Sequence, residues 1–222
     1  MGILRRGILG PVENTTGAVI GKVSNGQNII TGLRDVIPPL ATEDQAEQRY
    51  RFKLLREFFS SMPELVTVGF KKKKRVQSPA NAAYSRNAKK AFHLLETVEG
   101  AEKLNLKERV KLDYSALVYS IGPISGPNCG TAVRNSDATC TFSWLFYPQS
   151  KNNLLTDQAG YLIYNASTGE ASYQTGIAFR ADLSFNVALS PGDDVSELHF
   201  YMHFYSSTTL AIGNSIYLGS TT

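Results

Sequence analysis

Histidine pairs at short spacing can hold a metal ion, and this chain has one such pair. His199 and His203 lie four positions apart in the segment LHFYMHFY. On a helix that spacing would place both imidazoles on one face, where a single zinc ion could bind them. The segment alternates as a β-strand does, so the rings would lie about 13 Å apart. We therefore expect two surface histidines on a strand, and we expect His93 to be a structural residue of a helix.

Two cysteines and a pair of acids are the other residues able to do chemistry. Cys129 and Cys140 have neither the spacing of a zinc site nor that of a dithiol redox motif. We expect free thiols, and a bridge is the alternative. Asp193 and Asp194 follow Pro-Gly, an order typical of a turn rather than of a calcium site. The chain also lacks a phosphate-binding loop and a nucleophile elbow, so the sequence predicts no enzyme, no cofactor and no metal site.

Positive charge is concentrated in the first half of the chain. Residues 1–111 hold 20 Lys and Arg against 11 Asp and Glu, a net +9, whereas residues 112–222 hold 3 against 8, a net −5. Clustered cations bind nucleic acid without reading sequence, because they release phosphate counterions. A solvated loop between two helices is the alternative for the basic run, and no interleaved aromatic residue supports base stacking. The candidates for polyanion contact are Arg5, Arg6, Lys71, Lys72, Lys73, Lys74, Arg75, Lys89 and Lys90.

Residues 1–41 combine glycine with apolar side chains. Seven glycines prevent a stable helix, since each costs about 1 kcal/mol relative to alanine. A tail that is only solvated would not carry so many apolar residues, so we expect an extended arm that lies along its own body or along a neighbouring copy. The candidate assembly residues of this arm are Ile3, Leu4, Ile8, Leu9, Val19, Ile20, Ile29 and Ile30.

Residues 42–111 have helical periodicity. A capping box at Thr42–Gln45 predicts the start of one helix, apolar residues then recur every three or four positions, and Pro63 ends it. Residues 64–70 are expected to add a short helical turn. Ser78-Pro79 predicts the start of a second long helix that fades near Gly100. The fold expected here is two main helices joined by the basic loop.

From residue 112 the period changes from that of a helix to that of a strand. Trp144 is expected to anchor the core of this region. Seven short strands separated by Gly, Pro and Asp turns predict an antiparallel immunoglobulin-like or fibronectin type III-like β-sandwich over residues 112–222. The fold class expected for the whole chain is therefore α+β. The expected strands span residues 112–120, 138–147, 160–164, 171–176, 179–188, 197–205 and 215–219.

Composition limits where such a protein resides. Hydrophobic residues make up 42% and charged residues 19% of the 222 residues, which is typical of a soluble globular protein. No apolar run reaches the roughly 18 residues of a transmembrane helix. The apolar stretch near the N-terminus is too short for a secretory signal. We expect a location in the cytoplasm or within an assembled particle or filament.

Several short motifs occur in an order typical of one family. They are RRGILG, TEDQAEQRYRF, VGFKKKK, NAAYSRNAKKAF, LDYSALVYSIGPISG, TFSW, GYLIYN and NSIYLGS. Together they resemble a family of Bacteroidetes proteins of about this length that is catalogued as a domain of unknown function. The resemblance implies a C-terminal immunoglobulin-like or fibronectin-like sandwich and transfers no activity. Asn14-Thr15-Thr16 departs from the glycine-and-lysine pattern of that family.

These observations predict a non-enzymatic structural subunit that assembles with copies of itself through its N-terminal arm. A basic front and an acidic back could attract copies head to tail into a filament, a coat or a virion-like particle. One alternative is a binding or adhesion module that uses the loops of the β-sandwich. The other is a nucleic-acid-binding protein that does not read sequence.

Overall fold

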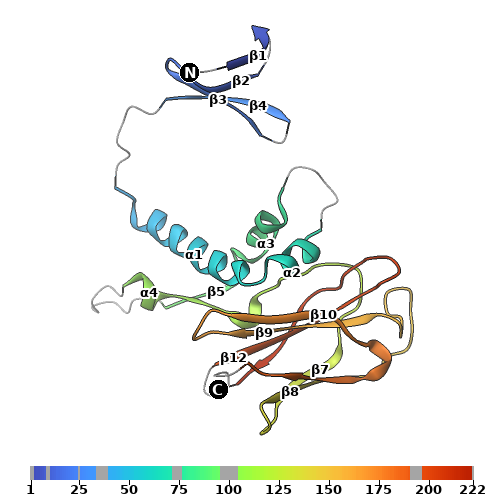
Figure 1. Ribbon diagram of the computed structural model, residues 1–222. Helices are drawn as coiled ribbons and strands as arrows, with labels where there is room; N and C mark the ends of the chain where they lie inside the picture. Colours follow the sequence, from blue (N-terminus) through green and yellow to red (C-terminus); the bar gives the residue numbers. More distant parts are fainter. Residues whose placement is uncertain are drawn as a thin grey trace. The chain divides into compact units, whose positions relative to one another are not determined.

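Strands are more abundant than helices in this structure (Figure 1). The computed structural model describes residues 3–8, 11–24, 26–33, 40–71, 77–95, 105–190 and 197–221. The described residues form two compact units, one from the N-terminus to Glu43 and the other from Asp44 onward. The predicted boundaries at residues 41/42 and 111/112 stay predictions.

The N-terminal unit is a four-stranded antiparallel sheet in the order β1-β2-β3-β4. Its strands are β1 (Ile3–Ile8), β2 (Val12–Thr16), β3 (Val19–Ser24) and β4 (Gln27–Gly32). Gly17 and Gly26 have φ angles of 57° and 78° in the turns before β3 and β4, a region that favours glycine. The glycines that exclude a helix therefore also make the hairpins. An extended arm was the wrong prediction for these residues.

Helices occupy the middle of the chain. They are α1 (Glu43–Ser60), α2 (Pro63–Gly69), α3 (Pro79–Asn87) and α4 (Leu106–Arg109). The helix predicted from Thr42 and the short helical turn after Pro63 are confirmed. Ser78 caps α3, as predicted, because its side chain accepts a hydrogen bond from the backbone N–H of Asn81.

The second long helix was predicted too long. The α3 helix ends at Asn87, and β5 (Phe92–Leu94) follows where more helix was expected. The buried amide of Asn87 donates to the carbonyls of Ala83 and Val118 and accepts from the Val118 N–H, which ties this helix end to a distant segment. Antiparallel pairing then joins β5 to β6 (Val110–Leu112). The strand predicted over residues 112–120 is also wrong, because a 3-10 turn occupies Tyr114–Ala116.

Two antiparallel sheets form the rest of the chain, in the orders β10-β9-β12-β13 and β11-β8-β7. The strand β7 was not predicted, whereas the others overlap predicted strands. The bounds are β7 (Asn128–Arg134), β8 (Thr139–Leu145), β9 (Gln158–Asn165), β10 (Ala171–Phe179), β11 (Ser184–Ala188), β12 (Leu198–Tyr205) and β13 (Ile216–Ser220).

The predicted fold class is therefore wrong. The prediction was an α+β chain with an extended arm and two main helices followed by a seven-strand immunoglobulin-like or fibronectin type III-like sandwich. The chain is instead mostly β, its helices lie in the middle of the sequence, and its described strands form four separate small sheets. Local periodicity identified most strands, but it carried no information on the hairpins of the first 33 residues or on the pairing of β5 with β6.

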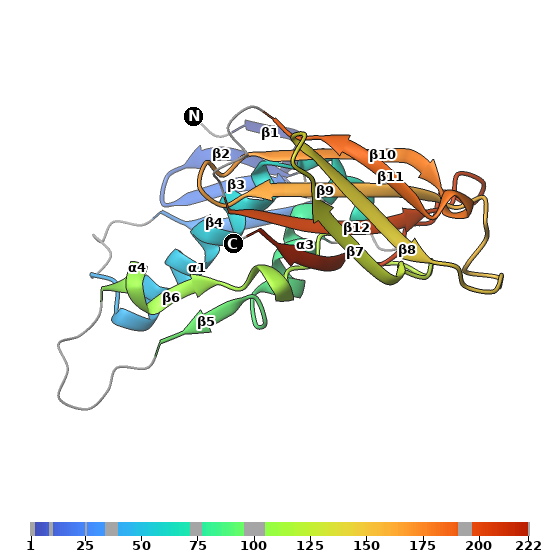
Figure 2. The ribbon, with the colours of Figure 1, turned by 90° about the horizontal axis from the view of Figure 1, so that it is seen from below.

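The four-stranded sheet β10-β9-β12-β13 is covered on both faces. Figure 1 shows α1 and α2 on one side of it and β7 and β8 on the other, and Figure 2 shows the three-stranded sheet crossing in front of it. Leu162 of β9 and Tyr201 of β12 pack with Phe58 of α1. Ile163 and Phe200, from the same two strands, pack with side chains of the three-stranded sheet. Double coverage explains why β9 and β12 are buried over nearly their whole length.

Trp144 confirms the predicted core anchor. Its indole is buried among Phe185 of β11 and Phe204 of β12, and its Nε1–H donates to the carbonyl of Arg180 at 3.0 Å. Burying a tryptophan with its N–H satisfied contributes apolar area without a desolvation cost. The two sheets are held together at this position.

Candidate functional site

One face of the N-terminal sheet carries exposed apolar side chains. In the register of β3 with β4, Gly21 lies opposite Ile30, and Val19 lies opposite Gly32. Directly opposed residues share a face, and residues two positions apart on one strand share it too. Val19, Val23 and Ile30 therefore lie on the same face, and they are 37%, 47% and 59% exposed. We call Val19, Val23 and Ile30 the apolar face.

The opposite face is better covered. Ile20 and Ile29 lie there and are partly buried. On the apolar face, Gly21 is the one buried residue among those of this unit whose side-chain environment is described. A Cβ at Gly21 would lie 2.0 Å from the carbonyl oxygen of Val12, so the strands approach closely only because this residue is glycine. The described part of the sheet thus has no apolar core of its own.

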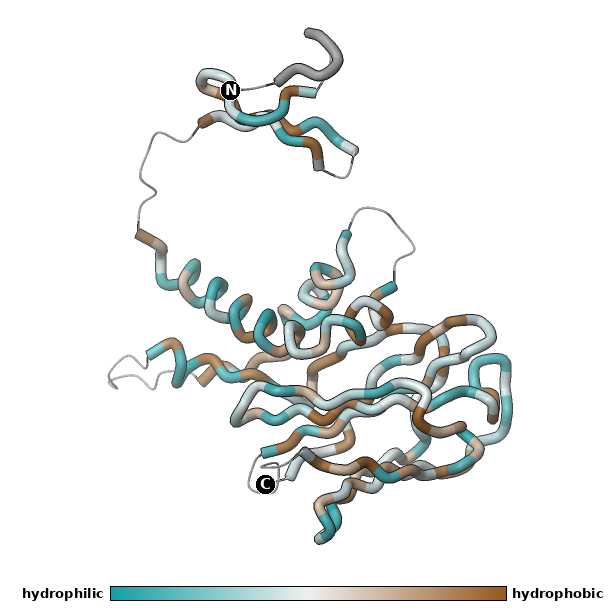
Figure 3. Tube along the Cα trace, viewed as in Figure 1, coloured by the Kyte–Doolittle hydropathy of each residue, from teal (hydrophilic) through white to brown (hydrophobic). Residues whose placement is uncertain are grey.

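The other predicted arm residues are less informative. Ile3, Leu4 and Ile8 lie in β1, where the backbone but not the side chains is described. Leu9 lies outside the described residues. The hydropathy colouring in Figure 3 shows that hydrophobic and hydrophilic residues are mixed along β2, β3 and β4.

The predicted polyanion contacts are described only in part. Lys71, Lys89 and Lys90 are exposed. Lys72, Lys73, Lys74 and Arg75 lie outside the described residues, and Arg5 and Arg6 lie in β1 without described side chains. Lys89 and Lys90 follow the end of α3. Three of the nine candidate cations are therefore placed at the surface.

The histidine pair lies on a strand, as predicted, but the prediction of surface histidines is wrong. His199 and His203 are both buried on β12, which is central in its sheet and covered on both faces. The Nδ1 of His203 lies 2.9 Å from the Tyr119 hydroxyl, and that of His199 lies 3.1 Å from the Tyr217 hydroxyl. Burial lowers the pKa of His203 to about 4 and also lowers that of His199, so both rings are neutral near pH 7.

The remaining candidates do not form a reactive centre. Cys129 is exposed and Cys140 is buried, both thiols are free, and burial raises the pKa of Cys140 to about 11. His93 lies on β5 rather than on a helix, and its Nε2 is 3.1 Å from a carboxylate oxygen of Asp113. The predicted turn at Asp193 and Asp194 lies outside the described residues. Within the described ranges no group of His, Cys, Asp or Glu side chains could hold a metal ion.

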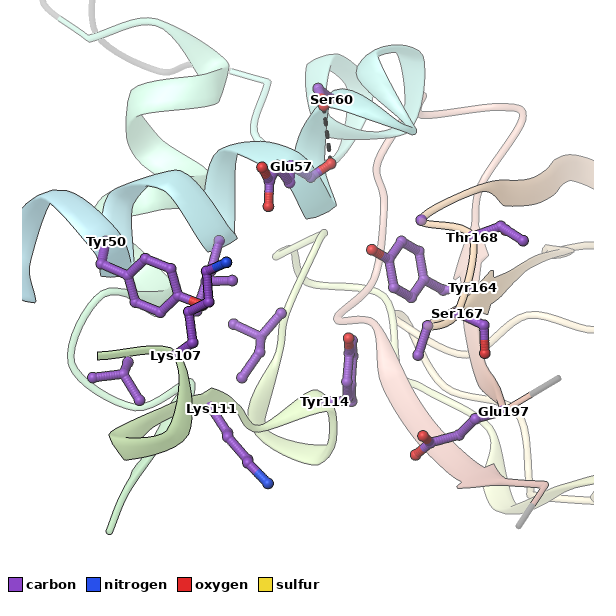
Figure 4. Close-up of a pocket in the computed structure, with 15 residues that line it drawn as sticks. Tyr50, Glu57, Ser60, Lys107, Lys111, Tyr114, Tyr164, Ser167, Thr168 and Glu197 are labelled. Carbon is purple, nitrogen blue, oxygen red and sulfur yellow. Dashed lines mark hydrogen bonds between the residues drawn. The ribbon is translucent and has the colours of Figure 1, made fainter. Parts of the chain in front are cut away.

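An open pocket of about 760 Å³ is a feature that the sequence did not predict. Figure 4 shows Tyr50 and Glu57 of α1 on its walls, Lys107 and Lys111 from α4 and β6, and Tyr114, Tyr164 and Glu197 from the following segments. Its volume is in the range of about 300–1,000 Å³ typical of small-molecule sites. Its side chains come from segments far apart in sequence, so no local motif could have identified it.

Two tyrosines on the floor of this pocket are packed among other aromatic rings. The Tyr114 and Tyr164 ring centroids are 5.7 Å apart, and the Tyr114 ring stacks on His199 at 3.8 Å. Burial, followed by the nearby Tyr164 and Glu197, raises the pKa of Tyr114 to about 12. Burial and then Glu57 raise the pKa of Tyr164 as well. Both hydroxyls therefore stay protonated and can donate hydrogen bonds.

Over residues 11–219 the chain matches a family described as a family of unknown function (DUF6266), so the predicted resemblance to such a family is confirmed. No curated protein matches the chain. The match extends from just before β2 almost to the end of β13, so the apolar face and the pocket both lie within it. Among the residues described, no helix combines the length and apolar character needed to cross a membrane.

Proposed function

Because the chain belongs to DUF6266, a family of unknown function, we propose its role from the structure: it is a non-enzymatic structural subunit that assembles with copies of itself through its N-terminal sheet. The observation that carries this proposal is the apolar face of Val19, Val23 and Ile30, which is exposed on a sheet whose described side chains form no core. The origin in Bacteroidetes indicated by the motifs stays a prediction.

Energetic considerations support a partner for this face. A small sheet depends on its hydrophobic face for stability, and that face contributes only when it is removed from water. Burying a valine or isoleucine side chain that would otherwise be exposed contributes about 1.5–3 kcal/mol. Three such side chains on one face supply a substantial driving force for association, although ordering the partners offsets part of it.

We assign a second copy of this chain as the occupant of the apolar face. The net charge of +9 on residues 1–111 and of −5 on residues 112–222 favours a head-to-tail arrangement of copies. A head-to-tail contact that does not close into a ring continues indefinitely, and the product is a filament or a coat. An assembled particle is the location that this function implies, with the cytoplasm as the site of synthesis.

Light scattering on size exclusion, with negative-stain images, tests this proposal. The comparison is between the full chain, a chain lacking residues 1–36, and two single variants of β4. Ile30→Lys places a charge on the apolar face, whereas Thr31→Lys places one on the opposite face of the same strand. We expect regular assemblies from the full chain and from Thr31→Lys, and monomers from the other two. Monomers in all four samples would remove the proposal.

A binding module is the second candidate function, and the pocket favours it. The turn between β9 and β10 supplies Ser167 and Thr168 to one wall, so a loop between strands takes part in the pocket. Binding of a partner by the monomeric protein, with binding lost when this pocket is altered, would favour this function over assembly.

Contact with nucleic acid or another polyanion stays a weaker candidate. It rests on the net charge of residues 1–111 and on the exposure of Lys71, Lys89 and Lys90. If it is correct, replacing the basic run from Lys71 to Arg75 with neutral residues will flatten the dependence of binding on salt. Unchanged salt dependence would leave this function without support.

A further inference from the structure

We propose that the tyrosine-floored pocket binds a neutral saccharide. The inference rests on the binding-module function and names its ligand class. It does not depend on assembly through the apolar face. Three features of the pocket carry it: unpartnered hydroxyls on the floor, rigid aromatic rings beneath them, and balanced charge on the walls.

The floor hydroxyls differ from those of neighbouring tyrosines. Tyr119 and Tyr217 place their hydroxyls within 2.9 and 3.1 Å of buried histidines, and Tyr201 donates to a backbone carbonyl at 2.7 Å. In the described part of the chain, the hydroxyls of Tyr114 and Tyr164 have no such partner. Tyr164 is only 6% exposed, yet Figure 4 shows its hydroxyl directed into the pocket. Each hydroxyl borders the open pocket, so a hydroxyl of a ligand can replace water as its hydrogen-bond partner.

Aromatic neighbours hold both rings in place. The Tyr164 ring packs edge-on against Phe58 with centroids 4.7 Å apart, and the Tyr114 ring is stacked on His199. Phe58 is fully buried and His199 nearly so, which limits motion of the floor. A preformed floor binds with little loss of conformational entropy. Flat apolar rings that carry hydroxyls match a sugar, which presents C–H faces and hydroxyl groups side by side.

The walls carry equal numbers of opposite charges. Lys107 of α4 and Lys111 of β6 line one side of the pocket. Glu57 of α1 and Glu197, which immediately precedes β12, also line it. A polyanion would meet the two carboxylates, and a polycation would meet the two ammonium groups, so neither is favoured overall. Charged groups form stronger hydrogen bonds to hydroxyls than neutral groups do. A neutral ligand rich in hydroxyls can use all four.

Isothermal titration calorimetry with four neutral hexasaccharides tests this inference on the full chain. The probes are cellohexaose, maltohexaose, xylohexaose and fully N-acetylated chitohexaose, and triglycine serves as a zwitterionic probe of the same charge balance. We expect at least one hexasaccharide to bind at millimolar concentration or better. Tyr164→Phe and Tyr114→Phe each remove one hydroxyl and keep the ring, and we expect each to weaken binding about fivefold.

Tyr147→Phe is the matched control, because Tyr147 is exposed and does not line the pocket. We expect it to bind as the wild-type chain does, with thermal unfolding checked for all variants. Binding of triglycine alone, weakened by the pocket variants, would overturn the saccharide and keep a binding module. The inference would be overturned if none of the five probes gave binding heat. It would also be overturned if Tyr164→Phe and Tyr114→Phe left saccharide binding unchanged.

Discussion

The N-terminal sheet and the sheet β10-β9-β12-β13 are both four-stranded and antiparallel, but they differ in what covers them. In the second sheet, β9 and β12 are buried on both faces, by α1 on one side and by the three-stranded sheet on the other. In the first sheet, Val19, Val23 and Ile30 on one face remain more than a third exposed. Strands with a similar alternation of residues are therefore buried on both faces in one sheet and partly exposed on one face in the other.

The comparison separates side chains that build the fold from side chains available for contact. Phe200 and Tyr201 are adjacent on β12 and point to opposite faces, yet both are buried because each face has its own cover. Ile30 is also apolar, but it is 59% exposed. Coverage rather than residue type decides which apolar residues are free to meet a partner.

The largest expected effect concerns the cover of the doubly buried sheet. Phe58 of α1 is fully buried and packs against Tyr164 of β9 and Tyr201 of β12. Phe58→Ala removes this ring and leaves a cavity, so the free energy of unfolding is expected to fall by about 3–5 kcal/mol. Urea unfolding followed by tryptophan fluorescence measures it. A loss under about 1 kcal/mol would mean that α1 does not hold this sheet.

A smaller effect is expected from the buried histidine of the same sheet. His203 has its pKa lowered from 6.5 to about 4 by burial, so the unfolded chain binds the proton first. The stability that this neutral ring contributes is present above about pH 6.5 and is lost as the pH falls toward 4, by at most about 1.4 kcal/mol per pH unit. His203→Gln should reduce the slope of stability against pH in this window. A slope equal to that of the wild-type chain would contradict the account.

The smallest effect on stability is expected in the N-terminal sheet. Val23→Ser removes apolar surface at a position that is 47% exposed, so the unfolding free energy of the chain as a monomer should change by no more than about 0.5 kcal/mol. Assembly should weaken in the same sample, because a residue of the proposed contact is lost. Urea unfolding of dilute protein and light scattering of concentrated protein measure the two effects. A large loss of stability at low concentration would place Val23 in a core.

Sequence periodicity predicted individual elements better than their arrangement. The alternation in LHFYMHFY identifies β12, but it cannot show that both faces of that strand are covered, so the burial of His199 and His203 was missed. The segment Phe92–Leu94 continues a helical pattern in sequence and becomes a strand only because Val110–Leu112 pairs with it. Tertiary contacts override local propensity in such cases.

The two candidate sites also differ in how far the sequence could predict them. Val19 and Ile30 could be proposed from sequence because apolar residues between glycines are unusual in a solvated tail, although their shared face depends on the β3–β4 register. The pocket could not be proposed at all. Tyr50, Lys111, Tyr164 and Glu197 lie on four separate segments and meet only through the pairing of strands and the packing of α1.

The central claim is that a second copy covers the apolar face, and cross-linking between labelled copies tests it most directly. Chains carrying a photo-cross-linking amino acid at position 23 are mixed with an equal amount of heavy-nitrogen-labelled chains, assembled and irradiated. Mass spectrometry then separates links within one chain from links between two. The account predicts hybrid-mass peptides that join the N-terminal sheet of one copy to its neighbour. Cross-linked peptides of uniform mass alone would contradict it, because the face would then be covered by its own chain.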